Sequence, residues 1–129
     1  MRTVDIGRLG EQRATRFLKK QGLKILAKNL HVSHNEIDII ALDKKERIAI
    51  FIEVKTRSVD SDLYSRFGTP ASAVTKSKQK RTVDAARGYL LQNRKLQNCA
   101  VRFDVIEVYI NKENFKIIKI NHIENAFGV

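Results

Sequence analysis

Small and apolar residues near the start of the chain recur with the spacing of a helix. Basic side chains separate them, and the recurring positions are Gly10, Ala14, Phe17 and Leu18. Positions three and four residues apart lie on one face of a helix, so the pattern predicts an amphipathic helix over residues 7–21. Gly22 follows directly, and glycine is typical of the position just after a helix.

A second helix is predicted over residues 75–92. Its inward face would carry Val83, Ala86 and Leu90, and Thr75 is a residue type that caps a first helical turn. The first turns of this helix are crowded with the basic residues Lys76, Lys78, Lys80 and Arg81.

Short apolar runs rich in Ile and Val predict five strands, at residues 23–30, 36–42, 47–56, 101–110 and 115–120. The charged residues 43–46 predict a hairpin turn between the second strand and the third. Residues 57–70 lack periodicity, which predicts a mobile loop, and a short tail is expected near Ala126 and Phe127. The order of helices and strands predicts an α/β fold, a mixed central sheet flanked by helices in one domain spanning residues 1–129.

The composition favours a polyanionic partner. The chain has 129 residues and 43% hydrophobic residues, enough for the core of one domain, and 25 Lys and Arg against 14 Asp and Glu give a net charge of +11. Nucleic acid is the first candidate, and a solvated basic surface or a ribosome-associated protein is the alternative. No signal peptide or membrane span is recognisable, and a single cysteine, Cys99, fits a reducing cytoplasm.

Charged residues interrupt two of the predicted strands. Successive side chains of a strand alternate between its faces, so Glu53 and Lys55 share one face of the third strand. Asp38 lies between Ile37 and Ile39, where a charge is costly unless it is paired or bound to a metal. If the hairpin pairs these strands, Asp38 and Glu53 approach each other.

Two carboxylates at one place suit a divalent cation. Oxygen ligands favour Mg²⁺ or Mn²⁺, and Lys55 would position a water molecule or stabilise developing negative charge. Glu11 lies at the inner edge of the first helix and would join the site directly or through water. The alternative is a same-face ion pair of Glu53 and Lys55 with solvated acids at the sheet edge, and Glu-x-Lys alone is a weak motif.

Five segments together resemble the YraN-like family of predicted endonucleases: GRLGE at 7–11, NEIDIIA at 35–41, FIEVKTR at 51–57, RFDVI at 102–106 and HIENAF at 122–127. That family resembles a branch of the PD-(D/E)xK nuclease superfamily and is similar to archaeal Holliday junction resolvases in its early helical Glu. The resemblance implies a restriction-endonuclease-like core, with Asp38, Glu53 and Lys55 as the catalytic trio and Glu11 as the helical acid.

Other polar residues have simpler expected roles. Arg57, Lys76, Lys78, Lys80 and Arg81 would grip phosphates or form a solvated face, with Lys76 the best placed. Asp104 is expected to be a buried acid paired with an arginine. His31, His34 and His122 lack ligand spacing and are expected at the surface or in loops, and Phe115 is expected in the core.

The leading hypothesis is therefore a magnesium-dependent endonuclease that hydrolyses phosphodiester bonds in structured or branched DNA, with DNA favoured over RNA. Cutting both strands of a symmetric substrate would require a homodimer. The alternative is a catalytically silent nucleic-acid-binding protein that assists DNA recombination, repair or uptake. A structural or ribosome-associated protein ranks last, because it gives no reason for Asp38, Glu53 and Lys55 to lie together.

Overall fold

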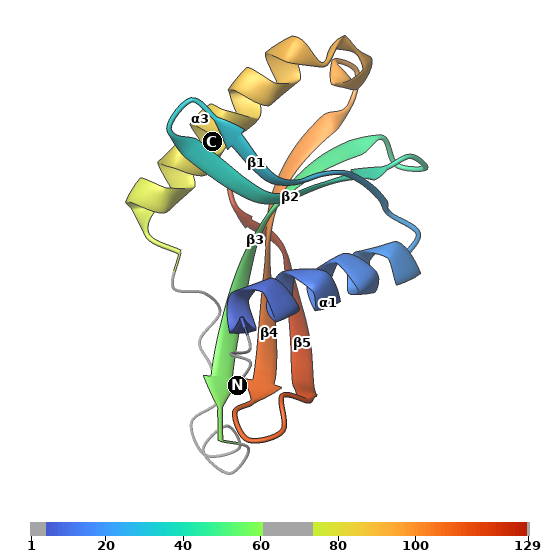
Figure 1. Cartoon of the computed structure of the whole chain (residues 1–129). Helices are drawn as coiled ribbons and strands as arrows, with labels where there is room; N and C mark the ends of the chain where they lie inside the picture. The colour runs from blue at the N-terminus through green and yellow to red at the C-terminus, as the bar shows by residue number, and fades with distance from the viewer. Residues whose placement is uncertain (1–4, 61–73, 129) are drawn as a thin grey trace.

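The computed structural model describes residues 5–60 and 74–128. It shows a single mixed sheet with one helix packed on each face (Figure 1). The predicted α/β fold with a mixed central sheet flanked by helices is confirmed, and this architecture is compatible with a restriction-endonuclease-like core. No helix in the described ranges is both long enough and apolar enough to cross a membrane.

Both long helices begin at a side-chain cap. Helix α1, Ile6–Lys20, starts after Asp5, whose carboxylate accepts a hydrogen bond from the Arg8 backbone N–H at 3.1 Å. Helix α3, Lys76–Gln92, starts after Thr75, whose hydroxyl accepts from the Lys78 N–H at 3.1 Å. Gly22 follows α1 with a φ of +86°, a conformation that glycine adopts without steric cost.

Five strands form the sheet in chain order. Their bounds are β1 Lys24–Val32, β2 Asn35–Asp43, β3 Ile48–Val59, β4 Ala100–Asn111 and β5 Ile117–Phe127. Neighbouring strands are antiparallel except β3 and β4, which pair in parallel from Ile48 beside Ala100 to Val59 beside Asn111. The connection between them contains α3 and the short 3₁₀ helix η1, Arg94–Leu96, as a parallel pair requires.

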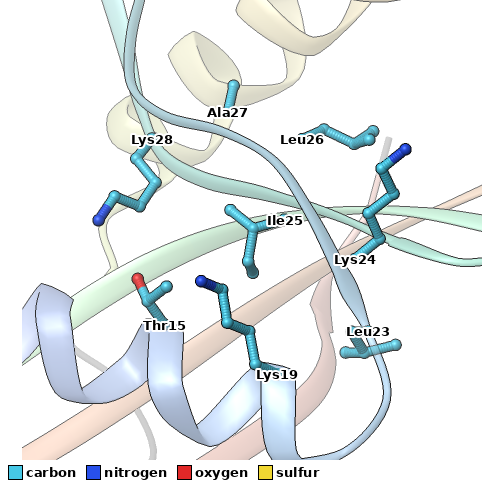
Figure 2. Close-up of a pocket in the computed structure, with 8 residues that line it drawn as sticks. All are labelled: Thr15, Lys19, Leu23, Lys24, Ile25, Leu26, Ala27 and Lys28. Carbon is cyan, nitrogen blue, oxygen red and sulfur yellow. The ribbon is translucent and has the colours of Figure 1, made fainter.

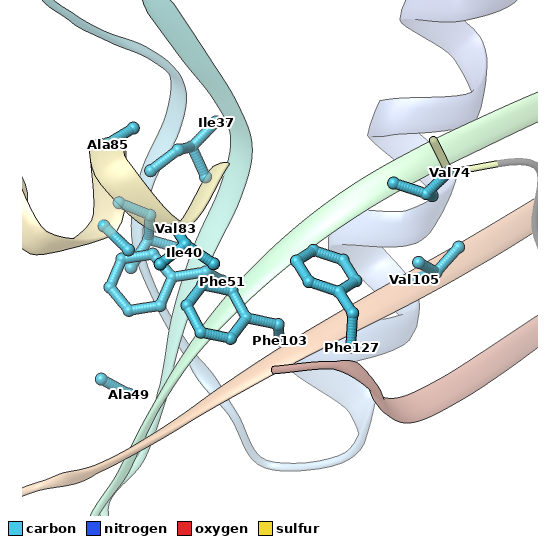
Figure 3. Close-up of a cluster of buried hydrophobic side chains, with 11 residues drawn as sticks. Ile37, Ile40, Ala49, Phe51, Val74, Val83, Ala85, Phe103, Val105 and Phe127 are labelled. Carbon is cyan, nitrogen blue, oxygen red and sulfur yellow. The ribbon is translucent and has the colours of Figure 1, made fainter. Parts of the chain in front are cut away.

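Alternating strand residues fill two separate hydrophobic clusters, one on each face. The α3 face holds an aromatic stack, with ring centroids 5.7 Å apart for Phe51 and Phe103 and 5.3 Å for Phe103 and Phe127 (Figure 3). The α1 face is aliphatic and buries Ala14 and Leu18 of the helix against strand residues that include Ile52. Since β3 is buried on both faces, a charged residue within it needs a partner.

Three details of the predicted secondary structure and core are wrong. Residues 57–59 belong to β3 rather than to a loop, because they pair with Tyr109, Ile110 and Asn111 of β4. The rest of the predicted loop, 61–70, lies outside the described residues. The expected tail at Ala126 and Phe127 is the end of β5, where Phe127 is buried. Phe115, expected in the core, lies in the β4–β5 turn and is 39% exposed.

Candidate active site

Asp38 lies where β2 and β3 separate. The pairing of the two strands runs from Asp43 beside Ile48 to Ile39 beside Ile52 and stops there. Beyond it, Oδ2 of Asp38 accepts a hydrogen bond from the Val54 backbone N–H at 2.8 Å. The carboxylate thus accepts the hydrogen bond that a backbone carbonyl would accept in a regular strand pair. This bond holds the Asp38 side chain against β3, beside Glu53 and one residue beyond the last paired residues.

Glu53 is surrounded by one acid and two lysines. Its carboxyl group is in hydrogen-bonding contact with that of Asp38. The Lys55 Nζ lies 3.9 Å from Glu53 Oε1, and the Lys78 Nζ lies 3.7 Å from Oε2. Only 6% of Glu53 is exposed. The site therefore combines two side chains of β3 with one from β2 and one from the first turn of α3.

Burial and mutual repulsion make both carboxyl groups reluctant to ionise. The pKa of Glu53 is raised from its ordinary 4.5 to about 7, mainly by burial and then by the charge of Asp38, against the opposing effect of the two lysines. Burial also raises the pKa of Asp38, although the N–H of Val54 favours its ionised form. At neutral pH the pair therefore retains much of one proton, held between the two carboxyl groups.

This raised pKa predicts how stability depends on pH. Glu53 binds its proton more tightly in the folded protein than in the unfolded chain, so its stabilising contribution is present below pH 4.5 and is lost as pH rises to about 7. The loss is on the order of 2 to 3 kcal/mol. We expect Glu53→Gln to remove this slope and to be more stable than wild type at pH 8, as measured by urea unfolding. Equal pH slopes for the two proteins would contradict the assignment.

Glu11 lies near this pair but is held by another residue. The side-chain amide of Asn29, oriented to donate, hydrogen-bonds Glu11 Oε1 at 2.6 Å. Burial raises the pKa of Glu11, and the charges of Asp38 and Glu36 raise it further. Within residues 5–60 and 74–128, no three His, Cys, Asp or Glu side chains are grouped closely enough to hold a metal ion. Glu11 therefore acts on Asp38 through charge, while Asp38 and Glu53 are in contact.

A close approach of α1 to β3 places Glu11 there. Gly10 is buried, and a Cβ added to it would overlap the side chain of Thr56. Glycine at this position lets the helix backbone lie directly over the strand that carries Glu53. Gly10 is thus needed for packing, and the adjacent Glu11 is the candidate chemical group.

Of the predicted phosphate-binding residues, Lys78 reaches the acidic pair, and Lys76 does not. Lys76 and its predicted partners Arg57, Lys80 and Arg81 are exposed. Lys76 lies along a different groove, with Val83 and Gly128. Lys78 and Arg81, with Glu36, line a hollow of about 160 Å³ beside the site. Lys78 lies in the first turn of α3, where its backbone N–H donates to the capping Thr75 hydroxyl while its ammonium group approaches Glu53.

Sequence reasoning missed Glu107. It is 1% exposed and lies beside Lys55 in the parallel pairing of β3 with β4. Its Oε1 accepts a hydrogen bond from the Asn121 side-chain amide at 2.9 Å. The alternation of β4 was the available signal, because Glu107 shares a strand face with Phe103 and Val105, which are both in the core.

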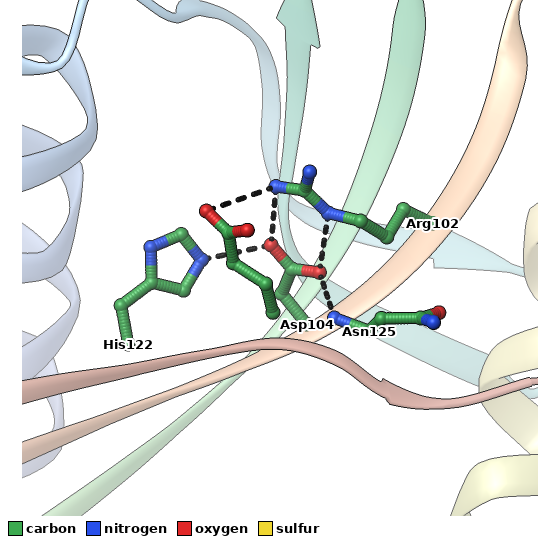
Figure 4. Close-up of polar contacts among 5 residues, drawn as sticks. Arg102, Asp104, His122 and Asn125 are labelled. Carbon is green, nitrogen blue, oxygen red and sulfur yellow. Dashed lines mark hydrogen bonds and ion pairs between the residues drawn. The ribbon is translucent and has the colours of Figure 1, made fainter.

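A further buried carboxylate, Asp104, has a structural network of its own (Figure 4). It is fully buried and accepts two hydrogen bonds from Arg102, each 2.9 Å long, and one from the Asn125 backbone N–H at 2.9 Å. Nε2 of His122 lies 2.8 Å from its Oδ2. The predicted pairing of Asp104 with an arginine is confirmed. The expectation that His122 lies at the surface is wrong, because only 7% of its side chain is exposed.

Burial alone would raise the pKa of Asp104, but hydrogen bonds with His122, Arg102 and Asn125 outweigh it and hold the pKa below its ordinary value. Asp104 is therefore ionised and satisfied at neutral pH. Asp104 differs from the Asp38–Glu53 pair in this respect, because Asp104 has its hydrogen-bond donors in place, whereas the two carboxyl groups of the pair repel each other.

Comparisons with known proteins agree on one family. The sequence model of the uncharacterised protein family UPF0102 matches residues 10–108. A UPF0102 protein of Caldicellulosiruptor saccharolyticus is 42% identical over 127 residues, covering 98% of this chain and all of that protein. A UPF0102 protein of Clostridium perfringens is 46% identical over 125 residues, covering 97% of this chain and 95% of that protein. The chain therefore belongs to the uncharacterised protein family UPF0102.

Proposed function

We propose that this protein is a metal-dependent endonuclease that hydrolyses phosphodiester bonds in DNA. The observation that carries the proposal is the contact between Asp38 and Glu53, with Lys55 and Lys78 at the two oxygens of Glu53. A structural ion pair needs one acid and one base, whereas two acids in contact raise each other's pKa and destabilise the fold. Such an arrangement is typical of a functional site.

The side chains at the site suit a divalent cation. Asp38 and Glu53 offer hard oxygen ligands, and a cation between them would offset the repulsion that raises both pKa values. These two residues would hold Mg²⁺ or Mn²⁺, and Glu11 would contribute charge or a ligand through water. The cation would supply Lewis-acid stabilisation of the negative charge that develops on the phosphate during hydrolysis.

Lys55 and Lys78 would act on the substrate directly. Lys55 shares a strand face with Glu53 and carries an ammonium group that can donate to a phosphate oxygen or orient the attacking water. Lys78 would release Glu53 and bind a substrate phosphate, since the hollow beside it is also lined by Arg81. The side chains of Lys55 and Lys78 are 29% and 30% exposed, so solvent can reach both.

The charge of the chain supports a nucleic-acid substrate. The net charge is +11, and the basic first turns of α3 lie beside the acidic pair. The resemblance to structure-selective nucleases favours branched or otherwise structured DNA over a specific base sequence, and a homodimer would allow two symmetric cuts. The resemblance of the chain to the PD-(D/E)xK superfamily also supports this proposal.

The test is cleavage of labelled single-stranded, duplex, flap and four-way-junction DNA by the wild-type protein, with an RNA duplex for comparison. Each substrate is incubated with Mg²⁺, with Mn²⁺ or with a chelator, and binding is read by gel shift in parallel. We expect cleavage of at least one DNA substrate that requires the cation. Binding without cleavage under both cations would overturn the proposal in favour of an accessory nucleic-acid-binding protein.

A further inference from the structure

A groove lies between α1 and the edge strand β1, apart from the acidic pair (Figure 2). Its cavity volume is about 570 Å³. Thr15 and Lys19 line it from the helix, and residues 23–28 line it from the strand and the turn before it. None of the residues in this lining is acidic.

Three lysines supply the charge of this groove. Lys19, Lys24 and Lys28 are exposed, and Figure 2 shows their amino groups spread along the groove instead of converging on one point. A small anion would be held by converging donors, whereas separated ammonium groups match the spaced phosphates of a polymer. The arrangement therefore fits a polyanion better than a single ion.

The groove follows an irregular part of β1, where the register with β2 shifts between Ile25 and Ala27. The Ile25 side chain points toward α1 and gives the groove apolar surface (Figure 2), whereas the side chains of Leu26 and Ala27 pack against the cluster on the α3 face. Because β1 is the edge of the sheet, its outer backbone groups face no other strand in residues 5–60 and 74–128. The groove thus combines ammonium groups, apolar contact surface and backbone donors, which are the groups that contact nucleic-acid phosphates and sugars.

The groove adjoins the candidate active site at one end. Lys28 lies at that end and directly precedes Asn29, whose side-chain amide hydrogen-bonds Glu11, the acid that interacts through charge with Asp38. Helix α1 is strongly basic, with one acid, Glu11, and the bases Arg8, Arg13, Arg16, Lys19 and Lys20, of which Lys19 lines the groove. A chain of phosphates that reaches Asp38 and Glu53 can therefore continue past Lys28 into the groove.

We propose that this groove binds the sugar–phosphate backbone of the DNA that extends beyond the scissile bond. The inference rests on the proposed nuclease function and adds a second DNA-contact surface, on α1 and β1, to the basic residues of α3. The occupant is duplex DNA, and contacts in the groove read the backbone rather than the bases.

The experiment compares two triple variants with equal loss of charge. The test variant is Lys19→Gln, Lys24→Gln and Lys28→Gln, and the control is Lys44→Gln, Lys45→Gln and Lys116→Gln, all at exposed positions. Binding to a 25-base-pair duplex is measured by fluorescence anisotropy from 50 to 200 mM salt with a chelator present. Each lost phosphate contact lowers the slope of log affinity against log salt by about 0.9.

We expect the test variant to lose two to three units of this slope and about 10- to 100-fold in affinity, while the control stays near wild type. Equal salt slopes for the two variants would overturn the groove as a DNA site and leave the nuclease proposal standing. A wild-type protein that does not bind DNA would overturn the nuclease proposal itself. Thermal unfolding of both variants checks that the exposed substitutions leave the fold intact.

Discussion

Replacing Glu53 with Gln is expected to lower the rate of cation-dependent DNA cleavage by at least about 100-fold, and Lys55→Ala by a similar factor. Glutamine keeps the shape of the side chain but cannot carry the negative charge that pairs with Asp38 around a cation. Alanine at position 55 removes the ammonium group 3.9 Å from Glu53. The measurement is the single-turnover rate on the best substrate of the wild-type protein.

Glu113→Gln is the matched control, because it removes one acid in the exposed β4–β5 turn, far along the chain from the site. DNA affinity measured with a chelator should be retained in Glu53→Gln, since the substitution removes a negative charge. If Glu53→Gln cleaves as fast as the control, the acidic pair is not the catalytic site. Loss of binding together with cleavage in Lys55→Ala would instead assign that lysine to substrate binding.

Asp104→Ala is expected to destabilise the folded protein by about 3 kcal/mol, which corresponds to the lower end of the range for breaking a buried ion pair. The substitution leaves the Asn125 N–H and the His122 ring without their acceptor. It also leaves a guanidinium group, but the Arg102 side chain is 20% exposed and can turn toward solvent, which limits the cost. Urea unfolding of the two proteins at pH 7 measures the difference.

Glu124→Ala is the control for this prediction. It removes an acid that also approaches Arg102, at 3.8 Å, but its side chain is 62% exposed. Exposed ion pairs contribute about 0 to 1 kcal/mol, so the control should lie close to wild type. A similar small effect for Asp104→Ala would show that the four-residue network adds little to stability, contrary to its burial and its short hydrogen bonds.

The sequence alone was sufficient for the helices and for most of the sheet. Its apolar periodicity predicted α1 and α3 nearly to their ends, because Thr75 and Gly22 are typical boundary residues. Alternation along β3 placed Glu53 and Lys55 on one face, and the hairpin turn predicted at residues 43–46, which the structure has at 44–47, placed Asp38 opposite. Local rules were enough here because the two strands are neighbours along the chain.

The second half of β5 was not predictable in this way, because polar residues interrupt its apolar pattern. Asn121 and His122 would be unfavourable in a half-buried strand without partners. Their partners are Glu107 and Asp104 on β4, which were themselves unusual residues for a buried strand. The polar residues of β5 and the buried acids of β4 are accounted for only by the pairing of the two strands, which neither sequence segment shows by itself.

The contact between Lys78 and Glu53 was also beyond local rules. A helix pattern shows which residues share a face, but the position of that helix along the sheet depends on how the whole core packs. The sequence therefore favoured Lys76, whereas in the folded protein it is Lys78 that contacts Glu53. The catalytic roles of Asp38, Glu53, Lys55 and Glu11 stay predictions that the cleavage experiments test.

The order of strands has a consequence for folding kinetics. Asp38 and Glu53 meet across a hairpin closed by residues 44–47, and such local contacts form quickly. The pairing of Ile48 with Ala100 must instead close a loop on the order of 50 residues, which is slow because of its entropy. Lys78 belongs to α3, which lies within that loop, so it reaches Glu53 only when the loop closes. The repelling carboxyl groups are thus assembled first, and one of their two neutralising lysines is added only in the slowest step.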